Sequence, residues 1–372
     1  MLVIEGLLRK LAQNPDVELL LTTTTSTGFR VASEKYSEIC DRIYYFPLDF
    51  WPFSRKFWKR LRPDLAICVE TELWPEHIQQ ASNAGVPMIL INGRLSDRSF
   101  RHAKKLRWLY RKHLRLVDRV LAISKQDAER FKTMGIAEDR IQVVGNMKLD
   151  VSIDKILSDD ERQRLKDELG FGSGFVLLGS STWPGEEEAL VAVFRELRER
   201  LADCRLLLVP RHAERRNEIR SLLERVATDL ECGFKLESSA FDRLDILVAD
   251  TSGELRTLTQ LADLAFIGKS LPPHKEGQTP IECGFLGVPM VHGAGMNNFR
   301  SVRDGLVEMR ASVEVSDQDS LRDALVSLAL DEESRREMSH NQAKWAAASR
   351  GALERTFAVI EGLVRDGVVK RA

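Results

Sequence analysis

The chain has 372 residues, 43% of them hydrophobic and 30% charged, which is typical of a soluble globular protein of about two domains. A net charge of −1 excludes an overall nucleic-acid-binding signature, and no apolar run approaches the roughly 18 residues that span a bilayer. Five scattered cysteines without a CxxC pair argue against a disulfide framework and a structural zinc site, and they favour a reduced, cytosolic compartment.

The first half of the chain alternates short β-rich runs with helical stretches. An amphipathic helix is predicted over residues 1–14, and helices at 75–85 and 125–135 separate later strands, with Gly135 as a C-terminal cap. The predicted strands cover 17–25, 42–47, 64–72, 86–93, 119–124 and 141–146. Several of them are apolar on both faces, which indicates a parallel sheet covered by helices.

The second half repeats this scheme, with helices such as 185–201 between its strands. The predicted strands cover 175–181, 204–211, 245–251, 263–268 and 288–293. Repeated β-α units imply right-handed crossovers and a parallel sheet. Residues 149–170 lack strand character, so we place the linker there.

We therefore predict two consecutive Rossmann-like domains, at residues 1–150 and 151–345. A helical segment follows within residues 346–372, and the sequence leaves open whether it packs back on the first domain.

Residues 50–62 combine aromatic and basic side chains without an acid after Asp49. On a helical wheel one face carries Phe50, Phe53, Phe57 and Leu61, with Trp51 and Trp58 beside them, and the other carries Arg55, Lys56, Lys59, Arg60 and Arg62. This is the pattern of a helix that lies in a membrane interface. A helix packed on the core with a solvated basic face fits about equally well.

Charged and amide side chains follow the strands of the first half. Glu70 and Glu72 come at the end of one strand, and period-2 alternation places them on the same side of it. They are interpreted as acid/base or substrate-orienting groups, or else as helix caps. Arg94 and Lys148 follow later strands. Cations and acids at one sheet edge suit an anionic, hydroxyl-rich substrate.

In the second half the same edge carries a candidate phosphate loop, since ligands of open parallel sheets bind beyond the carboxyl ends of the strands. Ser180, Ser181 and Thr182 precede a helix start, where hydroxyls and free N–H groups hold a phosphate, although ordinary capping of the helix by Ser or Thr is an equal alternative. Arg211 follows the next strand, and its planar fork suits a phosphate.

Three further expectations concern the loops that follow. Arg215 and Arg216 are expected to be solvated helix charges, and Glu254 is either a pocket residue or an acid favoured by a helix dipole. Glu282 lies in the first turn of a helix that Pro280 opens, where a carboxylate accepts both hydroxyls of a ribose. The simpler alternative is a helix-start acid. No GxGxxG follows a strand, so the dinucleotide fingerprint is missing.

Taken together, these segments resemble the 3-deoxy-D-manno-octulosonic acid (Kdo) transferases of lipopolysaccharide assembly, over nearly the whole chain. The resemblance is carried by LLTTTTSTGF, VETELWP, INGRLSDRS, VVGNMKLD, SSTWPGEEE, VPRHAER, ADTSGEL, GQTPIE and NNFR. Their order and spacing are specific together, although each motif alone is weak.

The resemblance implies a GT-B fold, an α/β architecture of two Rossmann-like domains with a cleft between them. It implies inverting, metal-independent transfer of Kdo from CMP-Kdo to a lipid A precursor, lipid IVA, at the cytoplasmic face of the inner membrane. No cofactor and no nucleic acid are expected. The alternatives are another GT-B enzyme, such as a nucleotide-sugar epimerase, and a non-catalytic lipid A-binding relic.

Residue roles follow from the same resemblance. Glu70 or Glu72 matches an acidic pair of the family, Arg211 the group at the CMP phosphate and Glu282 the group at the ribose. The nucleotide pocket is further expected to contain Ser180, Ser181, Gly253, Glu254, Gln278 and Thr279. The acceptor or membrane side is expected to contain Arg55, Lys56, Lys59, Arg60, Arg94 and Lys148.

The chain departs from the family pattern in three places. Gln278 and Thr279 replace His and Asn, and Trp183 stands where His is common. The family's first strand, membrane helix and SVGE base motif have no counterpart before Met1, and Glu5 lies too far along its helix to replace that base. We therefore expect a longer natural protein, an empty central position in the first sheet, and CMP binding with poor Kdo transfer by residues 1–372 alone.

Overall fold

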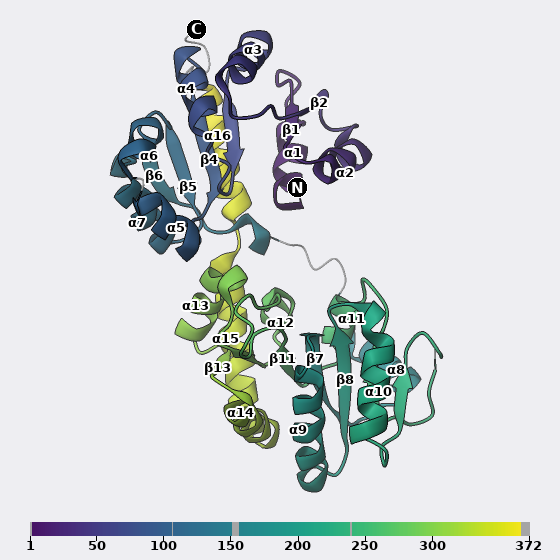
Figure 1. The fold of residues 1–372 in the computed structure, drawn as a ribbon. Coiled ribbons are helices and arrows are strands. Elements are labelled where there is room, and N and C mark those ends of the chain that lie inside the picture. Colours follow the sequence, from purple (N-terminus) through teal and green to yellow (C-terminus); the bar gives the residue numbers. More distant parts are fainter. Residues whose placement is uncertain (1, 106, 151–155, 239, 366–372) are drawn as a thin grey trace. The chain divides into compact units, whose positions relative to one another are not determined.

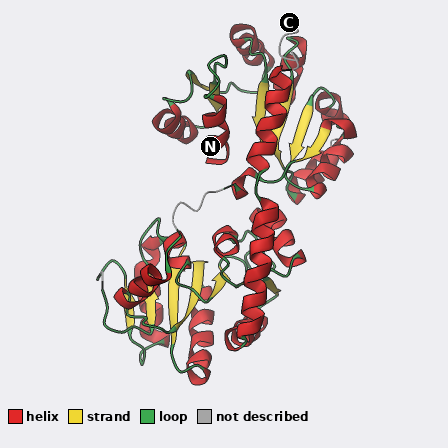
Figure 2. Ribbon diagram, turned by 180° about the vertical axis from the view of Figure 1, so that it is seen from behind, coloured by secondary structure: helices red, strands yellow, loops and turns green. Residues whose placement is uncertain are grey.

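The computed structural model describes residues 2–105, 107–150, 156–238 and 240–365. Contacts divide the chain into two units, residues 1–151 with 349–372 and residues 152–348. Each unit is an α/β assembly of parallel strands with helices around them (Figures 1 and 2). Of the predicted linker, residues 151–155 lie outside the described part, and α8 (Asp159–Glu168) belongs to the second unit.

The strands of the first unit form two separate parallel sheets. They are β1 (Leu20–Thr23) and β2 (Arg42–Tyr45) in one sheet, and β3 (Ala66–Val69), β4 (Met88–Gly93), β5 (Arg119–Ala122) and β6 (Ile141–Val143) in the other, in that order. All six predicted strands are confirmed, each with fewer residues than the apolar run suggested. Among the described residues no ladder joins β1 to β3.

Helices surround the sheets of this unit. They are α1 (Glu5–Leu11), α2 (Ser26–Tyr36), α3 (Trp51–Leu61), α4 (Pro75–Asn83), α5 (Asp97–Lys105), α6 (Arg107–Leu114), α7 (Lys125–Met134) and α16 (Ala352–Arg365), with 3-10 turns η1 (Leu2–Ile4), η2 (Glu138–Arg140) and η3 (Met147–Leu149). Local signals set the ends of α7. The Ser124 hydroxyl accepts from the Asp127 N–H, and Gly135 ends the helix at φ 107°, as predicted.

Two apolar cores lie on the opposite faces of the four-stranded sheet. Strand β4 contributes side chains to both cores, because its side chains alternate between the two faces of the sheet. Ile89 belongs to the core that contains Leu7 and Ile360, whereas Leu90 belongs to the core that contains Trp58 and Phe131. The period of two therefore decides which helices each face of the sheet contacts.

The second unit has one parallel sheet of seven strands. They are β7 (Phe175–Thr182), β8 (Cys204–Pro210), β9 (Cys232–Phe234), β10 (Ile246–Val248), β11 (Leu264–Ile267), β12 (Met290–Gly293) and β13 (Val313–Val315), in the order β13-β12-β11-β7-β8-β10-β9. The five predicted strands are confirmed, and the prediction missed β9 and β13, which have three residues each. The chain moves from β7 to one side and later to the other, so β7 and β11 flank the switch point where ligands of such sheets bind.

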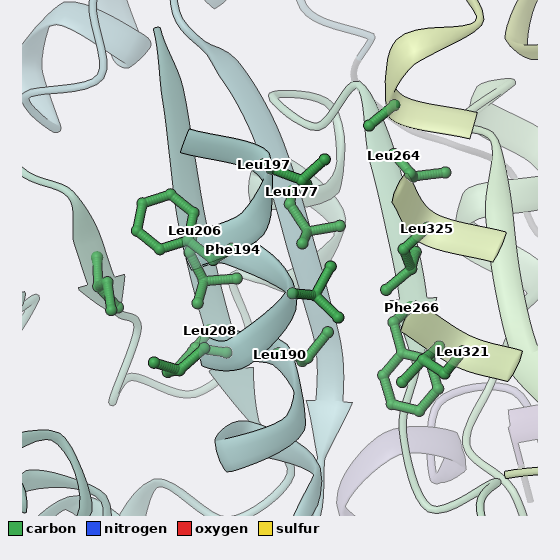
Figure 3. Packing of buried hydrophobic residues seen from close by; sticks show 14 of the residues in the cluster. Leu177, Leu190, Phe194, Leu197, Leu206, Leu208, Leu264, Phe266, Leu321 and Leu325 are labelled. Atoms are coloured by element: carbon green, nitrogen blue, oxygen red, sulfur yellow. The ribbon is translucent and has the colours of Figure 1, made fainter. Parts of the chain in front are cut away.

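The core of this unit is packed between the sheet and its helices (Figure 3). Helix α9 (Glu186–Arg200) places Leu190, Phe194 and Leu197 over β7 and β8, and α14 (Gln318–Leu330) places Leu321 and Leu325 beside β11. The remaining elements are η4 (Ala213–Arg215), α10 (Arg216–Val226), α11 (Leu255–Thr259), α12 (Ile281–Leu286), η5 (Asn297–Phe299), α13 (Arg300–Glu308) and α15 (Glu332–Ser349). This core holds the carboxyl ends of β7, β8 and β11 at one edge.

The last helical stretch is two helices rather than one. It breaks at Gly351, which has φ 87°, a conformation that glycine adopts without strain. The carboxylate of Asp150 accepts the N–H groups of Gly351 and Leu353 at the start of α16. The predicted boundaries were 150 and 345; the observed units meet at 151/152 and 348/349, and α16 belongs to the first unit.

Candidate functional site

The candidate phosphate loop lies at the switch point of the second unit. Ser180, Ser181 and Thr182 are buried at the end of β7, and the backbone turns at Ser181, where φ is 54° and the pairing with β8 is irregular. The Gly268 N–H donates to the Ser180 carbonyl at 2.8 Å. A Cβ on Gly268 would lie 2.4 Å from the Ser181 carbonyl oxygen, so glycine is needed for this approach.

Ordinary Ser or Thr capping does not explain the polar residues of this loop. Helix α9 begins after Gly185, which has φ 91° and no side chain to cap the helix. The Thr182 hydroxyl is buried and has no hydrogen-bond partner among the described residues. The serine and threonine side chains therefore remain candidates for binding a ligand.

Glu186, which was not predicted from the sequence, connects the loops that follow β7 and β11. Its carboxylate accepts the backbone N–H groups of Trp183 at 2.9 Å, Lys269 at 2.8 Å and Ser270 at 3.2 Å. Burial raises the pKa of the Glu186 carboxyl to about 7, although these backbone hydrogen bonds act to lower it. No signal in the sequence points to this role, because Glu186 is the first of three consecutive acids in SSTWPGEEE and acids are common in first helical turns.

Arg211 lies where the sequence predicted, directly after β8. It is exposed, and its N–H donates to the Thr182 carbonyl at 3.1 Å, which holds it beside the β7 loop. Its guanidinium makes no hydrogen bond or ion pair with the part of the chain that the structure describes. Arg211 is therefore a free cation at the switch-point edge, as an anion-binding group requires.

The expectation that Arg215 and Arg216 are solvated charges is wrong. Arg215 is largely buried and pairs with Glu187 at 2.6 Å, and Arg216 pairs with Asp250. Both carboxylates are fully buried, so each needs a cation to remain ionised there. A helical wheel does not reveal such pairs, because the acids lie on other strands and helices.

The loop after β10 is also fixed by a charge pair. Glu254 forms the N-terminal cap of α11 and pairs with Lys235 and the Thr251 hydroxyl. Burial would raise the pKa of Glu254, but these hydrogen bonds lower it below its ordinary value. Gly253, with φ 89°, lets the loop turn before the helix. These contacts favour a structural carboxylate over one that is free for a ligand.

The loop after β11 brings Gln278, Thr279 and Glu282 to the same edge. The Gln278 N–H donates to the Gly268 carbonyl at 3.0 Å, and the Thr279 hydroxyl donates to the Glu282 carboxylate at 2.9 Å. Pro280 is the residue before α12 rather than its first helical residue. The Glu282 side chain is half-buried, and its assignment to a ribose stays a prediction.

In the first unit, the structure joins Glu70, Arg94 and Lys148. Glu70 follows β3 with φ 59°, and its carboxylate lies 2.6 Å from the Lys148 ammonium and 3.2 Å from the Arg94 guanidinium. Burial would raise the pKa of Glu70, but Lys148 and Arg94 lower it below its ordinary value. Three residues from separate strand ends therefore form one charged cluster, as the edge argument predicted.

The expectation that Glu70 and Glu72 share one side of a strand is wrong. Strand β3 ends at Val69, and the turn that follows breaks the alternation, with the Glu72 N–H donating back to the Val69 carbonyl. Glu72 is exposed, and its carboxylate accepts the Trp74 indole N–H at 2.8 Å. The two acids therefore have different surroundings, and their catalytic assignment stays a prediction.

Helix α3 has features of both predictions for residues 50–62, a helix that lies in a membrane interface and a helix packed on the core. Trp58 is buried in the core, but Phe50, Trp51 and Phe53 are 52–59% exposed. Arg55, Lys56, Lys59 and Arg60 are exposed and make no ion pair with described residues, and Arg55 lies 5.2 Å from the Trp51 ring. A groove of about 760 Å³ beside α4 is lined by Trp51, Arg55, Lys59 and Arg62 among others.

The described residues contain no candidate metal site and no candidate membrane span. No three His, Cys, Asp or Glu side chains there are grouped as metal ligands. No helix there is both long and apolar enough to cross a bilayer. The five cysteines are free.

Comparison with known proteins places this chain. A family model described as 3-deoxy-D-manno-octulosonic-acid transferase matches residues 1–151. The 3-deoxy-D-manno-octulosonic acid transferase of Haemophilus influenzae is 30% identical over 97% of this chain and 84% of its own length. The chain belongs to the Kdo transferase family. The named members of this family are glycosyltransferase enzymes, and the chain is an enzyme of that kind.

Two further matches bear on the length of this chain relative to its relatives and on its fold. A bifunctional glycosyltransferase/methyltransferase of Fusobacterium nucleatum is 31% identical over 72% of this chain, which spans 41% of that protein. The UDP-GlcNAc 2-epimerase of Neisseria meningitidis matches with a TM-score of 0.63 and 13% identity, covering 97% of this chain and 96% of that one. At this identity the likeness shows the fold alone, and it confirms the predicted GT-B class.

Proposed function

We propose that this Kdo transferase family member transfers Kdo from CMP-Kdo to a lipid A precursor, lipid IVA, in lipopolysaccharide assembly. The observation that carries the proposal is the match to the Haemophilus transferase over 97% of the chain. The transfer is proposed to invert the anomeric carbon and to need no metal.

The donor is proposed to bind at the switch-point edge of the second unit. The exposed Arg211 guanidinium pairs with none of the described residues, and its planar shape suits the CMP phosphate. The buried Ser180 and Ser181, beside the unpartnered Thr182 hydroxyl, supply donors for phosphate oxygens. Glu282 is proposed to accept from the ribose hydroxyls, with Thr279 orienting its carboxylate.

The acceptor is proposed to meet the charged cluster of the first unit. Because Glu70 is ionised and paired with two cations, it is a poor proton acceptor and a good positioning group. It holds Lys148 and Arg94 toward the sheet edge, where they are able to bind an anionic acceptor. Glu72 accepts the Trp74 indole N–H and forms no ion pair with the described residues, so it is the carboxylate of the two that is more open to an acceptor.

The site of action is proposed to be the cytoplasmic face of the inner membrane. The support comes from α3, where exposed aromatic side chains lie beside cations that form no ion pair with the described residues. Aromatic rings favour the headgroup region of a bilayer, and cations favour anionic lipids.

Two measurements test the proposal. Calorimetry with CMP and with UDP should give binding of CMP alone. Incubation of the protein with CMP-Kdo and lipid IVA in detergent should raise the acceptor mass by Kdo residues, but only slowly for residues 1–372 alone, as expected from the sequence, and Arg211→Ala should reduce that product further. Binding of UDP without CMP would overturn the donor assignment and favour another nucleotide-sugar enzyme. Tight binding of the lipid by protein that neither binds CMP nor transfers Kdo would favour a binding protein.

A further inference from the structure

The indole of Trp183 lies at the centre of a nitrogen-rich cluster in the second unit. The Lys269 ammonium lies 4.3 Å from the centre of the indole, over its face. The His212 ring lies 5.2 Å away and the His274 ring 5.9 Å away, and both meet the indole edge to face. Neither imidazole makes a hydrogen bond within the described residues.

This cluster lies at the switch point. Trp183 follows β7, His212 follows β8, and Lys269 and His274 follow β11. Because β7 pairs with both β8 and β11 in parallel, the three strand ends meet at one edge. His212 is adjacent in sequence to Arg211, so the cluster begins one residue from the side chain that is proposed to bind the CMP phosphate.

The cluster is held in place before any ligand arrives. The Glu186 carboxylate accepts the N–H groups of both Trp183 and Lys269, so one buried acid fixes the two sides of the cation–π pair. The side chain of Lys269 is 22% exposed, and its ammonium forms a long ion pair of 3.8 Å with the exposed Glu276. The Lys269 charge is therefore only weakly compensated at the surface.

We propose that Trp183, Lys269, His212 and His274 form a subsite for the carboxylate of an acidic donor sugar. The inference rests on the proposed function, in which the donor is a CMP-linked sugar acid. In such a donor the group beyond the phosphate is the sugar, and its carboxylate is an anion that an ammonium and imidazole N–H groups bind. The indole face excludes water on one side of the ammonium and strengthens the attraction.

The test compares two ligands that differ by the sugar acid, namely CMP and freshly prepared CMP-Kdo. Lys269→Met should weaken CMP-Kdo binding about 10-fold or more, the effect of removing one charge-assisted bond, and should leave CMP binding within about 2-fold. Lys275→Met, which removes an exposed lysine of the same loop, is the matched control and should change neither affinity. His212→Gln should act like Lys269→Met with a smaller loss.

Three other outcomes have distinct meanings. An equal loss for CMP and CMP-Kdo in Lys269→Met would assign the cluster to the phosphate and overturn the carboxylate subsite. Unchanged CMP-Kdo binding in both Lys269→Met and His212→Gln would overturn it as well. If the unmodified protein binds neither ligand, the proposed function fails and the subsite fails with it.

Discussion

Glu70 and Glu186 are acids at the sheet edges of the two units, and they are stabilised in opposite ways. Glu70 is partly exposed and is held by two cations, Lys148 and Arg94. Glu186 is 3% exposed and is held by three backbone N–H groups. Side-chain cations are able to exchange a carboxylate for an incoming anion, whereas backbone amides fix a loop. The first edge is therefore adjustable and the second is preorganised.

The largest expected effect is on the preorganised edge. Glu186→Ala leaves three N–H groups of the β7 and β11 loops without an acceptor, and each costs about 1–3 kcal/mol, so the second unit should lose at least about 3 kcal/mol of stability. Urea unfolding measures the loss, and hydrogen exchange assigns it to the second unit. Glu188→Ala, an exposed acid of the same helix turn, should change stability by less than about 0.5 kcal/mol. An equally small effect of Glu186→Ala would remove the distinction between the two edges.

The next effect concerns the cationic surface of the first unit. Changing Lys56, Lys59 and Arg60 to Glu should weaken binding to anionic liposomes by about 3 kcal/mol or more, since each cation near the surface contributes about 1 kcal/mol. Co-sedimentation at low salt measures it. The same charge change at Arg200, Arg322 and Arg336 of the second unit should have little effect. Binding that ignores salt and the α3 changes would make α3 a packed core helix.

A smaller effect is expected at the proposed donor site. Arg211→Ala should weaken CMP binding by about 1.5–3 kcal/mol, the value of a hydrogen bond to a charged group. Calorimetry measures it, with Arg243→Ala, an exposed arginine of the same unit, as the control. If Arg211→Ala and Glu282→Ala both keep the parent affinity, CMP does not bind at this edge.

The smallest effect separates the two acids by pH. The folded pKa of Glu186 is about 7, above its ordinary value of 4.5, so the stability it contributes is complete below about pH 4.5 and is lost as pH rises through 7. Between pH 5 and pH 8 the advantage of the parent protein over Glu186→Gln should shrink by about 1–3 kcal/mol.

Glu70 provides the opposite case. Its folded pKa is lowered, so its contribution is complete above pH 4.5 and is lost as pH falls through the folded value. The advantage of the parent over Glu70→Gln should therefore stay level from pH 5 to pH 8. Urea unfolding at several pH values gives both curves, and parallel curves would show that the two carboxylates are in equivalent surroundings.

Much of each edge could be predicted from the sequence because a strand and the residue after it are local features. Runs of apolar residues located β7, β8 and β11, and polar residues after them placed Ser180, Arg211 and Glu282 at one edge of a parallel sheet. Gly135 ended a helix as predicted, since a left-handed cap favours glycine whatever the surroundings. Strand β9 was missed because its three residues, with a glycine at the centre, lie in no apolar run, whereas the equally short β10 lies in a run of apolar residues.

Tertiary structure alone decided which charges meet. The sequence contains Glu187, Asp250 and Glu186 as ordinary acids of first turns and strand ends. Burial next to other elements gave two of them an arginine partner and gave Glu186 three backbone amides. The same holds for α3, whose wheel predicted two faces but not that Trp58 would be buried while Phe53 stayed exposed. A local pattern fixes the direction of a side chain relative to its own element, whereas its partners, and with them its charge state, depend on elements distant in sequence.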